Sequence, residues 1–285
     1  MKSKKYIPYL LVAPYILHFL LFVAFPVVFS IVLTFHEWNI ISPMKFIGLA
    51  NYTRLFQDKF FSQSLVNTII FLVIHIPLQI IIALVLAEAL NQKIKFSGFF
   101  RAAFFLPVIV SGVVVTILWQ QLYGFDTGLF NKILTAIGLG RIGWLVDPSW
   151  AMPSIAIMAT WKNVGLYIIL FLVGLQTVPP QYYEAADLEG ANHWQKFFNI
   201  TLPMINPTIF MVLVLSTIGG FSLFIEPYVM TGGGPLNSTL SAVLYIYKQG
   251  FFYYHMGYSA TLGLFFAMLI LGVVAVQKKF IEKDK

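Results

Sequence analysis

The chain has 285 residues, of which 59% are hydrophobic and only 10% charged, a composition typical of polytopic membrane proteins that leaves no room for a large soluble domain. The absence of cysteine excludes disulfides, thiol nucleophiles and thiolate metal sites. The net charge of +7 could indicate nucleic-acid binding, but the lysines and arginines cluster at the ends of hydrophobic runs, which favours membrane topology as the explanation.

Six hydrophobic segments are long enough to cross a bilayer as helices, which takes roughly 20 residues. We expect these helices near residues 6–35, 65–90, 102–123, 154–178, 208–230 and 258–276. The first segment follows Lys2, Lys4 and Lys5 as in a signal peptide, but it is too long for one and no small-residue cleavage site follows. The sequence therefore predicts an all-α integral membrane protein whose residues 1–285 form one domain.

The positive charges between these segments predict the orientation of the helices, because lysine and arginine are enriched in cytoplasmic connections. If the N-terminus is cytoplasmic, eleven of these residues fall on the inner side: Lys2, Lys4, Lys5, Lys93, Lys95, Arg101, Lys196, Lys278, Lys279, Lys283 and Lys285. Six fall on the outer side: Lys45, Arg54, Lys59, Lys132, Arg141 and Lys248. The difference favours a multi-pass protein with both termini in the cytoplasm.

The predicted outer connections, residues 37–64, 124–153 and 231–257, are rich in aromatic residues, glycine and proline. Their aromatic residues include Trp38, Tyr52, Tyr123, Trp144, Trp150, Tyr253 and Tyr254. These positions fit an aromatic belt at the membrane surface, and the alternative is a landing surface for an external binding protein.

One inner connection, residues 181–203, is predicted to fold into an ordered helix–turn–helix and not to be an irregular loop. Residues 184–189 are mostly good helix formers, Gly190 allows a sharp change of direction, and Asn192 can cap a second short helix that begins near His193. The second helix carries the aromatic residues Trp194, Phe197 and Phe198. The pair is too short and polar to cross a membrane, so its aromatic face suits a surface held against protein or the membrane interface.

Sequence signals for catalysis are lacking. There is no G-x-x-x-x-G-K-[ST] phosphate loop, and the nearest glycine cluster, residues 232–235, lacks the lysine and is expected to be a flexible turn. The five histidines show no metal-ligand spacing, and no G-x-S-x-G element is present. We therefore expect a chain that is not an enzyme, has no cofactor or metal, and depends on other chains for any ATP hydrolysis.

Polar residues within the predicted spans mark a candidate cavity, because each is costly in hydrocarbon. Lys162 and Asn163 lie in the fourth span, and five positions of the fifth recur at helical spacing on one face: Ser216, Gly219, Gly220, Leu223 and Glu226. Glycine and serine also occur at close helix contacts, so helix packing is the alternative for this face. For Lys162 and Glu226 the alternative is that their side chains extend out of the span to the outer membrane interface.

The connection resembles a known motif. Glu184-Ala185-Ala186, then Gly190, then Ile200-Thr-Leu202-Pro203 is similar to the EAA loop of ATP-binding-cassette (ABC) importer permeases. In that family the loop is the cytoplasmic coupling helix, which docks in a cleft of the ATPase subunit. The resemblance implies coupling roles for Glu184, Ala185, Ala186, Asp187, Gly190, Ile200, Leu202 and Pro203, with Glu184 meeting a basic residue of the ATPase. The alternative for Glu184 is a solvated residue near a helix N-terminus.

Further segments extend the resemblance to nearly the whole chain. Leu65-Val-Asn67-Thr68, Phe100-Arg101-Ala-Ala-Phe-Phe-Leu106-Pro107 and Thr231-Gly-Gly-Gly-Pro235 are similar to the maltose-type sugar permeases. The resemblance implies a six-helix type I ABC importer transmembrane domain in a prokaryotic cell membrane. It also implies three kinds of partner: a second permease, most simply a different chain, two cytoplasmic ABC ATPases, and an external solute-binding protein. No large outer domain separates the first spans here, so such a binding protein would dock on shorter loops.

In maltose-type permeases the spans on either side of the coupling loop line the sugar site. The resemblance therefore implies a substrate path with the polar face described above: Lys162, Asn163, Ser216, Gly219, Gly220, Leu223 and Glu226. Tyr167, Phe221 and Phe224 are near enough in sequence to stack on a sugar ring. The predicted function is uptake of a sugar or oligosaccharide. The alternatives are a glycerol-phosphate permease, in which Lys162 would bind the anion, and a gradient-driven carrier, which leaves the EAA-like loop unexplained.

Overall fold

The computed structural model describes residues 7–92 and 95–281. Six of the lysines counted for orientation (Lys2, Lys4, Lys5, Lys93, Lys283 and Lys285) and the first residue of the first expected span, Tyr6, lie outside the described residues. The chain forms two compact units, one of residues 1–61 and 245–269 and the other of residues 62–244 and 270–285.

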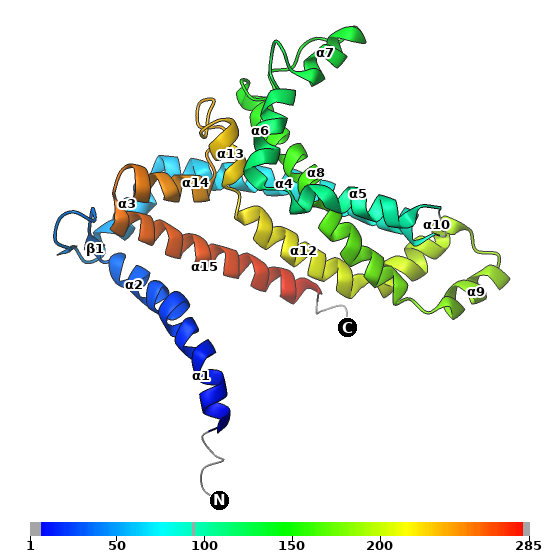
Figure 1. Cartoon of the computed structure of the whole chain (residues 1–285), viewed down its shortest axis with the longest axis horizontal. Coiled ribbons are helices and arrows are strands. Elements are labelled where there is room, and N and C mark those ends of the chain that lie inside the picture. Colours follow the sequence, from blue (N-terminus) through cyan, green and yellow to red (C-terminus); the bar gives the residue numbers. More distant parts are fainter. Residues whose placement is uncertain (1–6, 93–94, 282–285) are drawn as a thin grey trace, which may run out of the picture. The chain divides into compact units, whose positions relative to one another are not determined.

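Helices account for almost all of the regular structure that is described (Figure 1). They are α1 (Ile7–Phe19), η2 (Leu20–Ala24), α2 (Phe25–Leu33), α3 (Ala50–Gln57), α4 (Lys59–Asn91), α5 (Ser97–Ile109), α6 (Gly112–Leu122), α7 (Leu129–Ala136), α8 (Pro148–Gln176), α9 (Pro180–Leu188), α10 (His193–Lys196), η3 (Phe197–Thr201), α11 (Leu202–Met204), α12 (Asn206–Phe221), α13 (Ile225–Met230), α14 (Ala242–Tyr247), η4 (Lys248–Phe252) and α15 (Met256–Ile281), where η denotes a π-helical turn. Strands β1 (His36–Glu37) and β2 (Lys45–Phe46) pair antiparallel, with His36 opposite Phe46.

Among the described residues, five helical segments are long and apolar enough to cross a membrane. They are Tyr9–Leu33, Lys59–Asn91, Pro148–Gln176, Asn206–Met230 and Met256–Lys279. The sixth expected span, residues 102–123, is divided between α5 and α6, which meet at an angle of 97°. Figure 1 shows α6 turning away from α5. Val110 and Ser111 are extended at the elbow, and Pro107 removes a backbone donor in the turn before it, which weakens the end of α5.

The fifth span is also interrupted. Helix α12 ends at Phe221 and α13 begins at Ile225. The backbone N–H groups of Ser222 and Leu223 close the end of α12 by donating to the carbonyls of Gly219 and Gly220. The two glycines lower helix propensity at this point, so the chain leaves the helix there.

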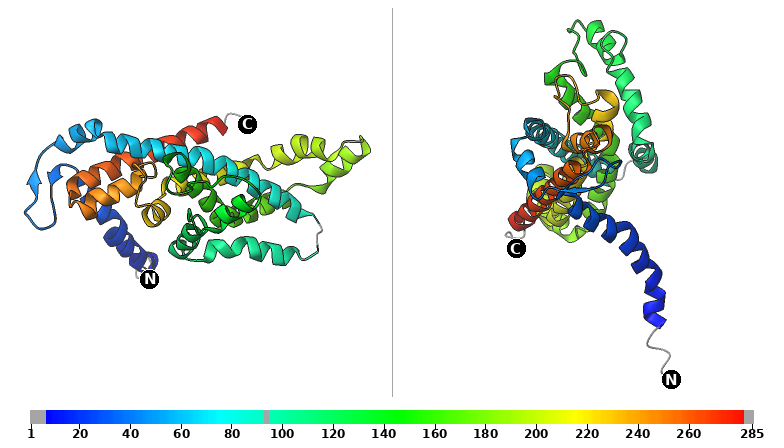
Figure 2. Two further views of the ribbon diagram at one scale, coloured as in Figure 1. Left: turned by 90° about the horizontal axis from the view of Figure 1, so that it is seen from above. Right: turned by 90° about the vertical axis from the view of Figure 1, so that its left-hand side faces the viewer.

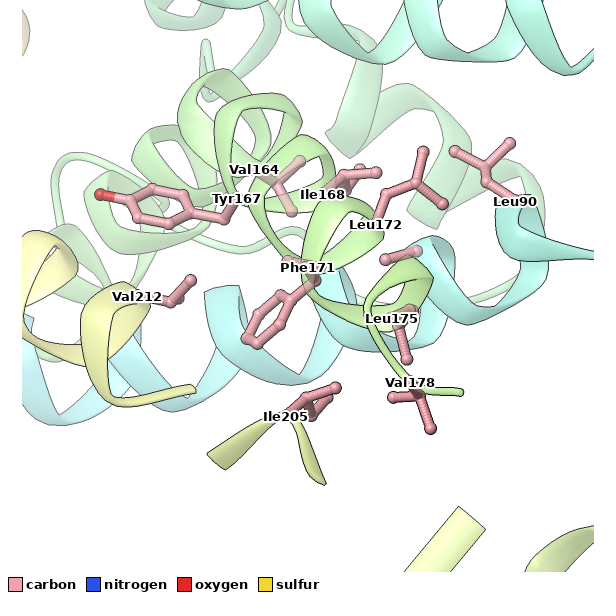
Figure 3. Packing of buried hydrophobic residues seen from close by; sticks show 12 residues of the cluster. Leu90, Val164, Tyr167, Ile168, Phe171, Leu172, Leu175, Val178, Ile205 and Val212 are labelled. Carbon is pink, nitrogen blue, oxygen red and sulfur yellow. The ribbon is translucent and has the colours of Figure 1, made fainter. Parts of the chain in front are cut away.

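Helix α8 is the centre of the larger unit, because 61% of its most apolar stretch is buried, compared with 6% for Tyr9–Leu33. In Figure 3, Phe171 of α8 lies beside Val212 of α12 and Ile205, and all three side chains are buried. Two glycines let α8 approach its neighbours closely: a methyl group at Gly165 would meet the backbone of Phe104 in α5, and one at Gly174 would meet the Thr208 side chain in α12.

In the smaller unit, Asp58 joins two distant parts of the sequence at the start of α4. Its Oδ1 accepts from the backbone N–H groups of Phe60 and Phe61, and its Oδ2 accepts from the hydroxyls of Tyr245 (2.6 Å) and Tyr258 (2.5 Å). Partial burial alone would raise the pKa of Asp58. The four hydrogen bonds outweigh this effect and hold the pKa below its ordinary value of 3.8.

Asp58 is therefore expected to make stability depend on pH in the acid range. Its folded-state pKa is depressed, so its contribution is present above the unfolded value of 3.8 and is lost as the pH falls below it. We expect the free energy of unfolding to fall more between pH 6 and pH 3 in the wild type than in Asp58→Asn. The expected difference is about 1 kcal/mol or less, because the carboxylate is partly solvated. Thermal unfolding at a series of pH values measures it. Parallel pH profiles of the two proteins would contradict this prediction.

Candidate coupling loop and central cavity

Helix α9 of the predicted connection ends in a left-handed turn. Gly190 has φ of +78°, and the N–H groups of Gly190 and Ala191 donate to the carbonyls of Asp187 and Ala186. This geometry is a glycine C-cap, which satisfies carbonyls that the helix leaves unpaired. A side chain at Gly190 would meet no atom within 4 Å, so the backbone conformation alone favours glycine there. The turn predicted from the sequence is thus observed.

The second helix, α10, is capped as the sequence predicts. Asn192 accepts from the backbone N–H of Gln195, and the Gln195 side chain accepts in return from the N–H of Asn192. An ion pair between Lys196 and Asp187 joins α10 to α9. The Tyr183 hydroxyl hydrogen-bonds to that of Thr201 at 2.9 Å. These contacts hold the two short helices together as one element.

The element exposes an apolar tip. Leu188 is 92% exposed, Trp194 67% and Phe198 58%, and the rings of Trp194 and Phe198 are stacked 6.2 Å apart. In Figure 1 and in the left view of Figure 2, α9 and α10 extend beyond the ends of α5 and α8 in the same unit. Large exposed side chains of this kind suit an interaction with another protein.

The eight expected coupling residues fall into two groups. Glu184, Ala185, Asp187 and Gly190 are exposed on the first helix and its turn, and Pro203 is exposed in α11; Ala186 is half-buried. Ile200 and Leu202 instead pack against the buried cluster around Phe171. Sequence reasoning missed Leu188 and the π-helical turn of Phe197–Thr201. Leu188 could have been found as a lone apolar residue in a polar stretch.

A cavity of about 240 Å³ lies among α4, α8, α12 and α13 in the larger unit. Its lining includes eight of the ten expected substrate-path residues: Lys162, Asn163, Tyr167, Ser216, Gly219, Gly220, Leu223 and Glu226. We call it the central cavity. The other two expected residues lie outside the lining: Phe221 is buried, and Phe224 is stacked on Tyr228 at 5.3 Å. The aromatic ring in the lining from the expected set is therefore Tyr167.

The break in the fifth span changes how these residues meet. A continuous helix from Ser216 to Glu226 was expected, but Leu223 lies in the break and Glu226 belongs to the first turn of α13. Glu226 is 8% exposed. In the described chain neither Glu226 nor Lys162 forms an ion pair, so the lining of the cavity contains one acidic and one basic side chain that are not paired with an opposite charge. The ammonium of Lys162 lies beside Gly112 at the elbow between α5 and α6.

Sequence reasoning missed the contribution of α4. His75 lines the cavity, and its Nδ1 is 2.8 Å from the hydroxyl of Thr160. One turn later, the Gln79 Oε1 accepts from Ser216 at 3.5 Å, and the fully buried Gln79 Nε2 has no partner among the described residues. The available signal was two polar residues spaced four apart in an apolar run, which places them on one helix face.

We expect Gln79→Leu to separate stability from solute binding. The leucine removes a buried amide nitrogen without a partner, so stability stays equal or rises by about 1 kcal/mol. It also removes the group that holds Ser216, so if this cavity lies on the expected substrate path, the KM for the solute rises severalfold. Thermal unfolding and uptake by reconstituted protein measure both, with Gln121→Leu, at an exposed position, as the control. Marked destabilisation would show that the amide nitrogen is satisfied in the protein.

Comparisons with known proteins identify a family and several similar chains. Residues 58–283 match the family described as "Binding-protein-dependent transport system inner membrane component". The chain is 39% identical to the probable ABC transporter permease protein YurN of Bacillus subtilis (strain 168), over 99% of this chain and 98% of the relative. It is 40% identical to the lactose transport system permease protein LacF of Rhizobium radiobacter, over 92% and 89% of the two chains.

Solved structures agree with the sequence relatives. The fold superposes with a TM-score of 0.82, at 25% identity, on a chain of the crystal structure of a bacterial alginate ABC transporter in complex with an alginate pentasaccharide-bound periplasmic protein. The match covers 96% of this chain and 93% of that chain. These findings confirm the predicted all-α type I permease fold and the resemblance to ABC importer permeases.

Proposed function

The chain belongs to the family of binding-protein-dependent transport system inner membrane components, and on that premise we propose that it is the permease subunit of an ABC importer that takes up a sugar or oligosaccharide. Members of this family are transport components, in agreement with the prediction that the chain is not an enzyme. The relatives transport lactose or alginate according to their names, which supports a carbohydrate substrate.

The observation that carries the coupling role is the exposed element of α9 and α10. It is internally fixed by the Asn192 cap and the Lys196–Asp187 ion pair, yet it presents exposed apolar and acidic side chains away from its own unit. A fixed element can transmit movement between a partner and the spans to which it is joined. We propose that this element, which consists of α9, the turn at Gly190 and α10 and is called the coupling element below, docks on a cytoplasmic ABC ATPase, with Glu184 meeting a basic residue there.

The remaining partners follow from this role. A second permease subunit, as a heterodimer, completes the pore, and an external solute-binding protein delivers the substrate. Both termini are then cytoplasmic and the protein spans a prokaryotic cell membrane several times. The exposed apolar surface of Tyr9–Leu33 is available for lipid or for the second permease.

We expect Glu184→Ala to release the ATPase from the permease without affecting membrane insertion. An affinity tag at the C-terminus, mild detergent extraction and mass spectrometry identify what co-purifies. The wild type should retain a P-loop ATPase and a second permease, and Glu184→Ala should lose at least about 80% of the ATPase, because removal of one partner of a docked ion pair weakens binding roughly tenfold or more.

Glu189→Ala is the matched control, since Glu189 is an exposed carboxylate of the same element outside the expected coupling set. It should retain the ATPase. Equal retention in both variants would contradict the role of Glu184, and a chain that transports without any ATPase would contradict the importer proposal.

Lys162 favours one alternative substrate class. A cation in the lining of the central cavity would suit a phosphorylated solute such as a glycerol phosphate. Uptake competition separates the two: inhibition by phosphorylated but not by neutral solutes would replace the sugar in the proposal.

A further inference from the structure

A second cavity, of about 840 Å³, lies wholly within the unit of residues 1–61 and 245–269. Its walls come from the connection between α2 and α4 and from residues 253–258, which precede α15 and form its first turn. With six spans, the end of the first span and the starts of the second and sixth lie on the same side of the membrane. That side is opposite the termini, so we call this space the outer cavity. None of its lining residues belongs to the coupling element or the central cavity.

Aromatic side chains form part of its wall: Trp38, Tyr253, Tyr254 and Tyr258. Tyr253 and Tyr254 are about half exposed, at 51% and 53%. Tyr254 has φ of +58°, a left-handed conformation that is uncommon for a bulky residue and persists only where the surroundings fix it.

Hydrogen bonds of the neighbouring residues fix the backbone around Tyr254. The N–H of Met256 donates to the Trp38 carbonyl at 3.0 Å, and the N–H of His255 donates to the Gln249 carbonyl at 2.8 Å. The His255 ring also bonds the Gln249 side chain at 2.9 Å. The backbone of this corner, which carries the two exposed tyrosines, is thus held in place before any ligand arrives.

Another part of the wall is also fixed. Asp58 holds the hydroxyl of Tyr258, and the guanidinium of Arg54 lies 4.0 Å from the centroid of the Tyr258 ring. Arg54, Glu37 and Lys45 all line the cavity, and none of them forms an ion pair in the described chain. Their charged groups are therefore available for hydrogen bonds to a ligand.

This combination fits a saccharide better than other ligand classes. Sugar rings present C–H faces that pack on aromatic side chains and hydroxyls that bond to guanidinium, ammonium and carboxylate groups. A lipid tail would require an apolar wall without these three charges. A nucleic acid would require charges of one sign, whereas Glu37 lines this cavity together with Lys45 and Arg54.

We propose that the outer cavity is a second saccharide-binding site, which holds the solute on the side of the membrane from which it enters. It is separate from the central cavity, and its occupancy does not depend on which residues line the transport path. The proposal goes beyond the permease role, which requires only one site.

The test measures saccharide binding to the full-length chain in phosphatidylcholine nanodiscs. Extraction avoids maltoside detergents, because their sugar headgroups would compete for the site. Saturation-transfer NMR and calorimetric titration are carried out with lactose, maltotriose and trigalacturonate as probes. We expect at least one of them to bind, with roughly tenfold weaker affinity in Tyr253→Leu and in Lys45→Ala, and with affinity restored in Tyr253→Phe.

Asn163→Ala changes the central cavity and distinguishes the two sites: it weakens any binding there, whereas the binding that Tyr253→Leu and Lys45→Ala weaken should remain. Tyr253 and Lys45 are exposed, so their variants are expected to fold, and thermal unfolding checks this. Absence of binding by all three probes at millimolar concentration would overturn the proposal. So would binding that is unchanged in Tyr253→Leu and Lys45→Ala but lost in Asn163→Ala, a result that would leave the permease role intact.

Discussion

Replacement of Gly190 by proline is expected to reduce solute uptake by at least about tenfold while leaving the protein inserted and folded. Proline fixes φ near −65°, whereas Gly190 has φ of +78°, and proline also removes the N–H that donates to the Asp187 carbonyl. The turn between α9 and α10 then has to change its course, so the coupling element can no longer present both helices to the proposed ATPase partner. Uptake into proteoliposomes of the assembled transporter measures the effect.

Two further substitutions at Gly190 serve as matched controls, because a Cβ atom added there meets no atom within 4 Å. The effect of alanine therefore comes from backbone conformation and not from a clash. Asparagine tolerates the left-handed region, so Gly190→Asn should retain most of the uptake. In Gly190→Ala the uptake should lie between those of the asparagine and proline variants, because the left-handed conformation costs alanine about 1 kcal/mol. Equal uptake by all three variants would show that the geometry of the turn does not matter for coupling.

Gly165→Ala is expected to destabilise the larger unit by about 1–3 kcal/mol, a large effect for one methyl group. The added Cβ would lie 2.1 Å from the carbonyl oxygen of Phe104 and 3.0 Å from the Cα of Phe105. Both atoms belong to the backbone of α5, so no side-chain rotation can relieve the clash and α5 must move away from α8. Thermal unfolding in detergent, followed by aggregation or by tryptophan fluorescence, measures the loss.

Gly263→Ala in α15 provides the comparison. A methyl group there meets nothing within 4 Å, so the usual preference of helices for alanine should leave stability equal or about 0.5–1 kcal/mol higher. The two substitutions are chemically identical and are expected to have opposite signs. A similar stability for both variants would contradict the close packing of α5 on α8.

Local features of the coupling element followed from the sequence. Its signals act between residues close in the chain: helix formers from Glu184, a glycine at the turn and an asparagine cap before His193. Such interactions need no distant partner, so propensity and capping rules predicted them. The ion pair between Lys196 and Asp187, nine residues apart, was not predicted, because it depends on how the turn brings the two helices together.

The candidate path shows the opposite case. The residue types of the fourth and fifth spans indicated which segments would supply polar groups, but a straight helix was assumed from residue 208 to residue 230. The break after Phe221 moves Glu226 onto α13 and leaves Phe221 and Phe224 outside the lining. The roles of His75 and Gln79 follow only from the packing of α4 against α8 and α12, because a polar residue in an apolar run does not indicate which residue it contacts.

The sequence by itself determined the class of protein, the apolar segments and the coupling element, because composition, hydrophobic length and capping are properties of residues near one another. The tertiary structure decided the elbow between α5 and α6, the central cavity and the outer cavity. These features depend on contacts between residues far apart in the chain, such as Asp58 with Tyr258 or Gly165 with Phe104. Such contacts form by packing and hydrogen bonding when distant segments meet, so they cannot be predicted from patterns among neighbouring residues.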